Sequence, residues 1–157
     1  MTRDSYQDIR DSDMFVNGWH RCEKTLTFAG ATLNGVGDFD GTGNPATLFS
    51  VTGIIRARIY AKCTTDLAIA GGATLSVGTA LTVAGLIALT AGDAIDINEI
   101  WHDATPDASI ELDTVVTEKI VSQDIKANTA TANINTGVIK FVLFWRAVTD
   151  DGNAVSA

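Results

Sequence analysis

The sequence contains few of the residues that catalytic and metal sites require. Its 157 residues include two histidines and two cysteines, and no serine or cysteine stands in a recognisable nucleophile-elbow sequence. Acid–base and nucleophilic catalysis depend on such side chains being brought together in one place. We therefore expect a protein that is not an enzyme and that uses no cofactor and no metal.

Long hydrophobic runs are also missing. The richest stretch, 81–89, is interrupted by Thr82 and Gly85 and is far shorter than the roughly 20 apolar residues of a membrane-spanning helix. The first ten residues mix charges of both signs, and no apolar core follows them, so they do not resemble a secretory signal peptide. We expect no membrane contact, and synthesis and folding in the cytoplasm.

Positive charge is scarce. Eleven Lys and Arg stand against 19 Asp and Glu, which gives a net charge of −8. Phosphate neutralisation needs clustered cations, so we expect no direct nucleic-acid contact. Charged residues make up only 19% of the chain and hydrophobic residues 46%, whereas soluble globular chains carry roughly 25% charged residues. This shortage of charge favours an oligomer that hides part of its surface.

The two cysteines, Cys22 and Cys63, leave two alternatives open. Cytoplasmic synthesis keeps thiols reduced, and free cysteine is among the most buried residue types. We predict buried, reduced thiols; a disulfide between the two is the alternative.

The first 21 residues differ from the rest of the chain. They mix acids, bases and amides and show no sustained period of two or of 3.6 residues. Met14, Phe15 and Trp19 lie close together in this stretch, and disordered segments are poor in aromatic residues. We predict an extended N-terminal arm at 1–21 that docks onto a surface, followed by one domain at 22–157.

From residue 22 onward the chain consists of short β-type runs separated by Gly, Asn, Asp and Pro, which is the pattern of a sandwich or barrel. A glycine-rich loop is expected at 30–45, and a turn at 135–137. We predict an all-β fold, an antiparallel β-sandwich of jelly-roll type. The predicted strands are 22–28, 47–51, 53–63, 73–77, 81–90, 109–112, 119–125, 128–134 and 137–148.

The last of these runs has two apolar faces. Because successive strand residues point to opposite sides, one face carries the apolar set Ile139, Phe141, Leu143, Trp145 and Ala147, which we predict to be core. The other face places Val142 and Phe144 between the cations Lys140 and Arg146. That combination is too apolar for open solvent and too charged for a sealed interior, so it predicts a face that is half-buried against a partner.

The run 53–63 alternates in the same way. Its outward face carries Arg56, Arg58, Tyr60 and Lys62. Two interpretations remain open: charged strand faces discourage wrong pairing, and aromatic residues with arginine are typical of interface hot spots. The interface candidates, facing an acidic neighbour or another copy of the chain, are Arg56, Arg58, Tyr60, Lys62, Lys140, Val142, Phe144 and Arg146.

Two loops carry weaker patterns. Asp38 and Asp40, followed by glycines, partly match a calcium-binding loop, but Thr42 stands where that pattern needs a third Asp or Asn; an acidic surface loop is the favoured interpretation. His102 and Asp103 are adjacent, as a general base or a metal site would want, yet neighbours in an extended segment point apart. We favour a structural turn at this position, with Trp101 as a packing anchor.

Several segments together resemble a family of small tailed-bacteriophage virion proteins that are encoded near the major capsid protein and act as head decoration or cement proteins. The similarity covers roughly residue 25 to the end. The matching segments are TLTF at 25–28 with Gly30, CTTDL at 63–67, ATLSVG at 73–78, EIWHDATPD at 99–107, FWR at 144–146 and DGN at 151–153.

The resemblance implies an all-β, trimeric subunit on the capsid surface of a virion, with the major capsid protein as its partner. It brings no catalytic motif, so no functional residue is carried over. The expected function is to stabilise the phage head by burying apolar surface at capsomer junctions. The alternative is a head-fibre or tail-associated binding module for a host-surface glycan, with Trp101, His102 and Asp103 as the candidate cluster.

Overall fold

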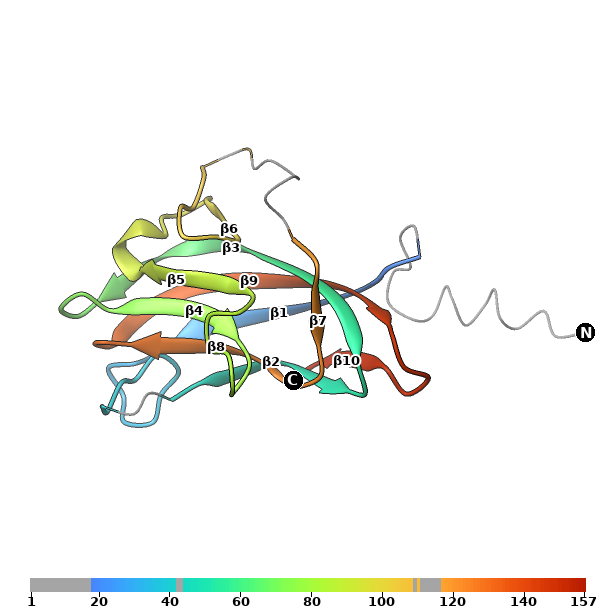
Figure 1. Cartoon of the computed structure of the whole chain (residues 1–157). Coiled ribbons are helices and arrows are strands. Elements are labelled where there is room, and N and C mark those ends of the chain that lie inside the picture. Colours follow the sequence, from blue (N-terminus) through green and yellow to red (C-terminus); the bar gives the residue numbers. More distant parts are fainter. Residues whose placement is uncertain (1–17, 42–43, 109, 111–116) are drawn as a thin grey trace, which may run out of the picture.

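The computed structural model describes residues 18–41, 44–108, 110 and 117–157, and in this part of the chain it is built from ten strands and one short 3-10 helix, η1 (Gly92–Ala94). The strands form two five-stranded antiparallel sheets that pack against each other (Figure 1). The predicted all-β antiparallel sandwich is therefore confirmed. Within the described residues, no helix is long and apolar enough to cross a membrane.

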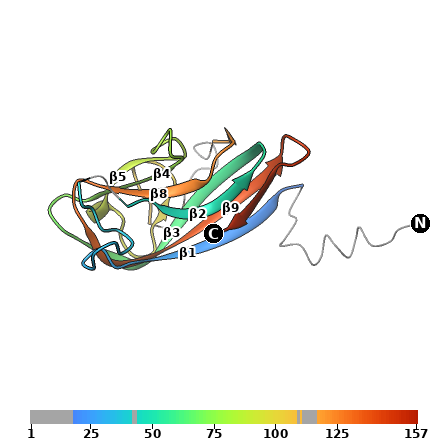
Figure 2. The ribbon, with the colours of Figure 1, turned by 90° about the horizontal axis from the view of Figure 1, so that it is seen from below.

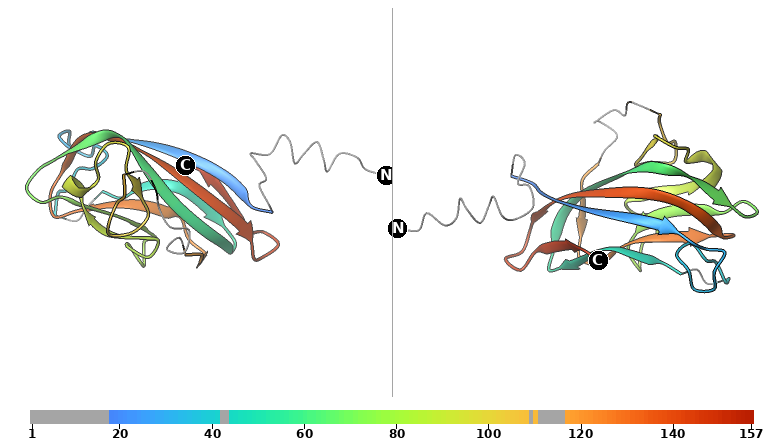
Figure 3. Two further views of the ribbon diagram at one scale, coloured as in Figure 1. Left: turned by 90° about the horizontal axis from the view of Figure 1, so that it is seen from above. Right: turned by 180° about the vertical axis from the view of Figure 1, so that it is seen from behind.

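The first sheet has β9 (Ile134–Ala147) at its centre, between β1 (His20–Phe28) and β3 (Ile55–Ile69). Two short strands, β6 (Ile100–Trp101) and β7 (Lys119–Val121), pair with the far edge of β3. The second sheet follows the order β10 (Asn153–Ser156), β2 (Ala46–Thr52), β8 (Ile125–Ala130), β4 (Thr74–Gly78) and β5 (Ile87–Ala91). Figures 2 and 3 show the long, twisted β1, β9 and β3 lying side by side as one layer.

Apolar and polar residues alternate along β9, so that one side of the strand packs between the two sheets. Ile139, Phe141 and Leu143 are fully buried between the sheets, as predicted, while Ala147 at the end of the strand is exposed. Leu48 and Ile125 of the second sheet are fully buried as well. A slip of one residue in the pairing would turn every core side chain toward solvent, so the apolar period fixes the register of β9 on both neighbours.

The predicted turn at 135–137 is wrong. The chain turns at 131–132, where Thr131 has φ +72°, and β9 runs straight through 135–137. Gly137 has φ +127°, and a Cβ there would lie 2.5 Å from Leu67 Cδ2 and 2.8 Å from the Asp66 carbonyl oxygen. The β3–β9 register shifts between Cys63 and Thr65 and again before Ala68, so this glycine admits a β-bulge and not a chain reversal.

Other predicted runs also differ from the structure. The run 128–134 is divided by the turn at 131–132, because β8 ends at Ala130 and β9 begins at Ile134. Only Ile87–Ala91 of the run 81–90 is a strand, because the amides of Thr79 and Gly85 both bond to the Thr82 carbonyl and close a loop. The run 119–125 spans β7 in one sheet and the first residue of β8 in the other. The run 109–112 lies outside the described residues, except for residue 110. Strands β6 and β10 were missed because they are only two and four residues long.

The boundary of the arm also moves. β1 begins at His20, so the last two residues of the predicted arm belong to a strand, and residues 1–17 lie outside the described part. Cys22 is half-buried, Cys63 is fully buried, and the two are not joined by a disulfide. Cys22 lies opposite Leu143, and Cys63 lies opposite Ile139. The two cysteines therefore sit at different levels of the sheet and on strands separated by β9.

Candidate functional site

The two strand faces that were singled out separately form one surface. β3 and β9 are neighbours, and their register sets Arg56 opposite Arg146, Arg58 opposite Phe144, Tyr60 opposite Val142, and Lys62 opposite Lys140. All of these residues alternate with buried ones, so their side chains point away from the second sheet. We call this surface the outer face, and it brings together all eight predicted interface residues.

β1 extends the outer face by one strand. Arg21 lies opposite Phe144, and Glu23 lies opposite Val142. At the other edge Ile120 of β7 lies opposite Arg56 and is 62% exposed. The sequence analysis missed these three residues, although the alternation of the run 22–28 already places Glu23 on the side away from the core.

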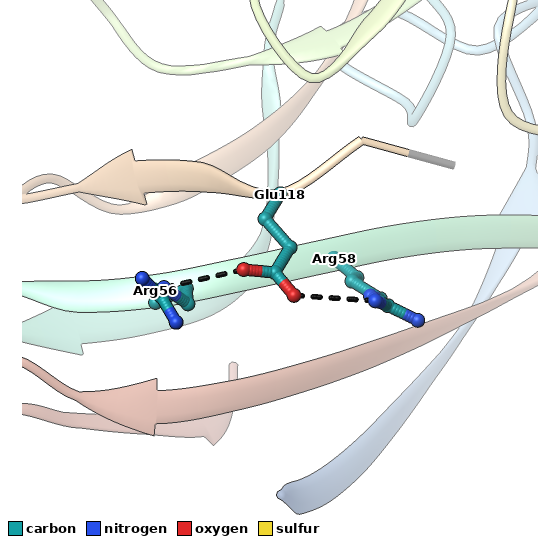
Figure 4. A network of polar contacts seen from close by, with 3 residues as sticks. All are labelled: Arg56, Arg58 and Glu118. Carbon is teal, nitrogen blue, oxygen red and sulfur yellow. Dashed lines mark hydrogen bonds and ion pairs between the residues drawn. The ribbon is translucent and has the colours of Figure 1, made fainter. Parts of the chain in front are cut away.

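Like charges face each other at both ends of the outer face. Arg56 is opposite Arg146, and Lys62 is opposite Lys140, and directly opposed like charges destabilise a sheet. Among the described residues, two carboxylates relieve this repulsion. The Arg56 Nε and the Arg58 Nη2 each lie 3.2 Å from one oxygen of Glu118 (Figure 4). Glu23 pairs with the Lys140 Nζ at 2.6 Å and also with Arg21.

Trp19 covers the Arg146 end of the outer face. The ring centroid lies 4.5 Å from the Arg146 guanidinium carbon and 5.3 Å from that of Arg58, which is the geometry of a cation–π contact. The sequence analysis placed Trp19 in the arm. In the structure, Trp19 is part of the outer face. Its position in the sequence next to the start of a strand was the signal that could have indicated this.

The apolar part of the outer face is more covered than the sequence suggested. Tyr60 and Phe144 contact each other with ring centroids 5.9 Å apart, and both are half-buried. Val142, which lies opposite Tyr60 on β9, is only 9% exposed. Part of the burial that we expected from a partner is therefore supplied by the long charged side chains and Trp19 of the same chain.

The outer face is positively charged, although the chain as a whole is negatively charged. Arg21, Arg56, Arg58, Lys62, Lys140 and Arg146 stand against Glu23 and Glu118, which gives +4 for the face. The whole chain carries −8, so the remaining residues carry −12. A positively charged surface attracts acidic ligands even when the molecule as a whole is negatively charged. The outer face is therefore suited to an acidic ligand.

The Trp101–His102–Asp103 segment is built into the fold. Trp101 is fully buried, donates its Nε1–H to the Thr90 Oγ1 at 2.9 Å, and packs edge-on against Phe141, which confirms its role as a packing anchor. His102 is 6% exposed. The Asp103 carboxylate accepts the Thr105 amide at 2.7 Å and so caps a turn. A buried tryptophan cannot stack on a sugar ring, so these three residues do not form an exposed glycan site.

The acidic loop at 38–44 is also tied to its own backbone. Asp38 is only 7% exposed, and its Oδ2 accepts the Asn34 amide at 2.7 Å. The Asp38 carbonyl oxygen accepts the Asn44 Nδ2 at 3.3 Å. Residues 42–43 of this loop lie outside the described part.

The sequence analysis missed a groove whose lining is partly polar and partly apolar. A cavity of about 340 Å³ lies between the 79–86 loop and β7. Leu81, 83% exposed, and Ile120 line it together with Lys119 and Gln123. Because Ile120 pairs with Arg56, this groove adjoins the edge of the outer face. Treating 81–90 and 119–125 as regular strands concealed it.

Comparison with protein-family models, with curated proteins and with solved structures finds no match for this chain.

Proposed function

We propose that the protein is a structural virion protein that decorates and stabilises a phage head, with the outer face as its docking surface. One observation carries the proposal: an acidic chain gathers six of its cations around the aromatic pair Tyr60–Phe144 on a single sheet face. The sequence resemblance to small virion proteins supplies the biological setting. Such a protein needs a durable contact surface and no active site.

The outer face suits an acidic partner. Glu118 and Glu23 hold Arg56, Arg58 and Lys140 in place, so little side-chain freedom remains to be lost on binding. Aromatic and arginine side chains at the centre of a surface are typical binding hot spots. The proposed partner is an acidic surface of the major capsid protein, and the proposed location is the outside of the virion.

We also propose a jelly-roll arrangement and a homotrimer. The strand order supports the first, because β1, β9, β3 and β7 form one sheet while β2, β8, β4 and β5 form the other, an order that two wrapped Greek keys produce. The trimer is supported by the low fraction of charged residues and by the threefold sites of closed shells, where cyclic trimers fit.

The test is binding to empty heads that carry the neighbouring major capsid protein. The wild-type chain is expected to co-sediment with these heads. The double variant Lys62→Glu with Lys140→Glu is expected to bind at least tenfold more weakly, because the two glutamates that replace these cations would repel an acidic partner. The control is Lys126→Glu, which reverses one charge on β8 of the other sheet and should leave binding unchanged.

Imaging of the decorated heads tests the assembly. Three-lobed density that presents the outer face to the shell or to a neighbouring copy is the expected result. Wild-type protein that does not bind, or a double variant that binds as well as wild type, would contradict the proposed docking surface. A specific glycan-array signal together with no head binding would favour the binding module.

A further inference from the structure

The groove between the 79–86 loop and β7 leaves two large apolar side chains open to solvent. We call it the side groove; its volume is about 340 Å³. Leu81 and Ile120 both line it, yet they are 83% and 62% exposed. Of the described residues that line it, only Lys119 carries a charge. Exposed apolar side chains that gather in one place mark interaction sites, and the cation favours an acidic neighbour.

The turn at 96–99, which we call the acidic turn, has the complementary chemistry. Its Ile97 is 48% exposed, and Asp96 beside it is exposed as well. The Asp66 Oδ1 accepts the Ile97 amide at 2.6 Å, and the Glu99 Oε2 accepts the Asp96 amide at 2.8 Å. An exposed apolar side chain among three carboxylates therefore matches an open apolar groove that carries a cation.

The acidic turn is fixed too far from the side groove of its own chain to reach it. The Asn98 amide donates to the Cys63 carbonyl oxygen at 2.9 Å, and Asp66 holds the turn one residue earlier. The groove residue Ile120 lies opposite Arg56, which is ten residues, or about 30 Å of strand, from Asp66 along β3. In Figure 1 the segment before β6 and strand β7 lie toward opposite ends of β3. A contact between the turn and the groove must therefore join two copies.

We propose that the acidic turn of one copy docks into the side groove of a second copy. Ile97 lies between Leu81 and Ile120, and Asp96 pairs with Lys119. Because the two surfaces differ, each copy offers its turn to one neighbour and its groove to another, and a contact of this kind that closes forms a ring. The contact rests on the proposed homotrimer and supplies its interface.

The side groove suits Ile97 better than the outer face does. An apolar side chain gains most where it covers apolar surface that is still open to water. On the outer face Val142 is only 9% exposed, whereas Leu81 and Ile120 in the side groove are mostly exposed. The outer face therefore stays available to the acidic partner of the proposed function.

The mass of the full-length chain in solution, measured by light scattering after size-exclusion chromatography, tests the contact. Wild type is expected at three times the monomer mass of 16.5 kDa. Ile97→Asp is expected at the monomer mass, because it would place a carboxylate between two apolar side chains. The matched control is Leu33→Asp, which changes a side chain that is 79% exposed on a different loop and should keep the wild-type mass.

Charge reversal gives a second measurement. Lys119→Glu alone and Asp96→Lys alone should each weaken association at least tenfold, because each places like charges against each other in the contact. The two changes in one chain should restore association, since they exchange the charges of the pair. A variant that merely disturbed its own fold would not be rescued in this way.

A wild-type chain at the monomer mass, or an Ile97→Asp variant at the wild-type mass, would overturn the proposal. Loss of the trimer in Lys62→Glu with Lys140→Glu would also overturn it, because the contact would then involve the outer face. Co-sedimentation with heads is measured separately. An Ile97→Asp trimer together with head binding by wild type would remove this contact and leave the proposed function standing, whereas a wild-type trimer that does not bind heads would do the reverse.

Discussion

The buried position of Cys63 in β3 determines the protonation of its thiol. Its side chain is fully buried on the inner side of β3, opposite Ile139, and its thiol lies 3.2 Å from the Thr65 carbonyl oxygen, which accepts the S–H. The pKa of the Cys63 thiol is raised to about 11, chiefly by burial and to a smaller extent by the carboxylates of Asp66, Asp96 and Glu99, while the Thr65 bond lowers it. At neutral pH this thiol is protonated and therefore unreactive.

The raised pKa makes folding stability depend on pH in the alkaline range. In the unfolded chain the thiol ionises near pH 9, while in the folded chain it stays protonated to about pH 11. Its contribution to stability is complete below pH 9 and is lost as pH rises toward 11, by up to about 2 kcal/mol. Urea unfolding at pH 8 and at pH 10.5 measures the loss, and Cys63→Ala should show a smaller loss than wild type.

The matched control for this prediction is Cys22→Ala, which removes the half-buried thiol of β1 and should keep the wild-type pH dependence. If Cys63→Ala and wild type lose equal stability over this range, the burial of the Cys63 thiol is not the cause.

At the scale of single residues, alternation in the sequence was enough to place Cys63 and Trp145 inward and Arg58 outward. It could not place Trp19 or Glu118, because both contact the outer face from segments that carry no alternating pattern. Nor could it show that Val142 is buried on the outward side, since that depends on the long side chains of two neighbouring strands.

At the scale of elements, the β3–β9 pair carries opposed cations that weaken it. Lys62 and Lys140 are directly opposite each other near the middle of a long antiparallel pair. Lys62→Glu would replace this repulsion with an attraction, so we expect it to raise the free energy of unfolding by roughly 0.2–1 kcal/mol at low salt. Urea unfolding in low salt measures this change, and the gain should shrink in 0.5 M NaCl.

Lys126→Glu on β8 serves as the control, because it reverses a charge without changing an opposed pair of cations on β9. A less stable Lys62→Glu variant would show that the two ammonium groups do not repel each other in the sheet. A Lys62→Glu variant that is more stable but binds heads more weakly would indicate that the charge of Lys62 serves binding to a partner and not folding.

The sequence predicted which segments form strands better than it predicted where those strands begin and end. The runs with strong alternation, 22–28 and 53–63, match β1 and the first part of β3. The ends failed where tertiary pairing decided them. β3 continues to Ile69 because β9 remains its partner through three register shifts, and 119–125 divides because its two parts belong to different sheets.

At the scale of the whole molecule, charge is separated between one face and the rest. A face of +4 on a chain of −8 should steer association with an acidic partner, and such steering weakens as salt rises. We expect the rate of association with empty heads to fall at least tenfold between 0.05 and 0.5 M NaCl. Stopped-flow light scattering measures this rate over the salt series.

The Lys62→Glu with Lys140→Glu variant provides the comparison, because it changes the charge of the outer face from +4 to 0. Its association rate should be low at all salt concentrations and nearly independent of salt. A wild-type rate that does not change with salt would mean that the charge of the outer face has no part in docking.

The sequence by itself determined the class of fold and the inward and outward sides of the long strands, because the period of two that defines a β-strand is written locally in the order of apolar and polar residues. Only the tertiary structure decided that the cations of residues 56–62 and 140–146 form one surface, since strand neighbours are set by pairing between segments about 80 residues apart. The same pairing brought Glu118 and Trp19 onto that surface. Contacts of this kind depend on distances in space, which local sequence periods do not encode.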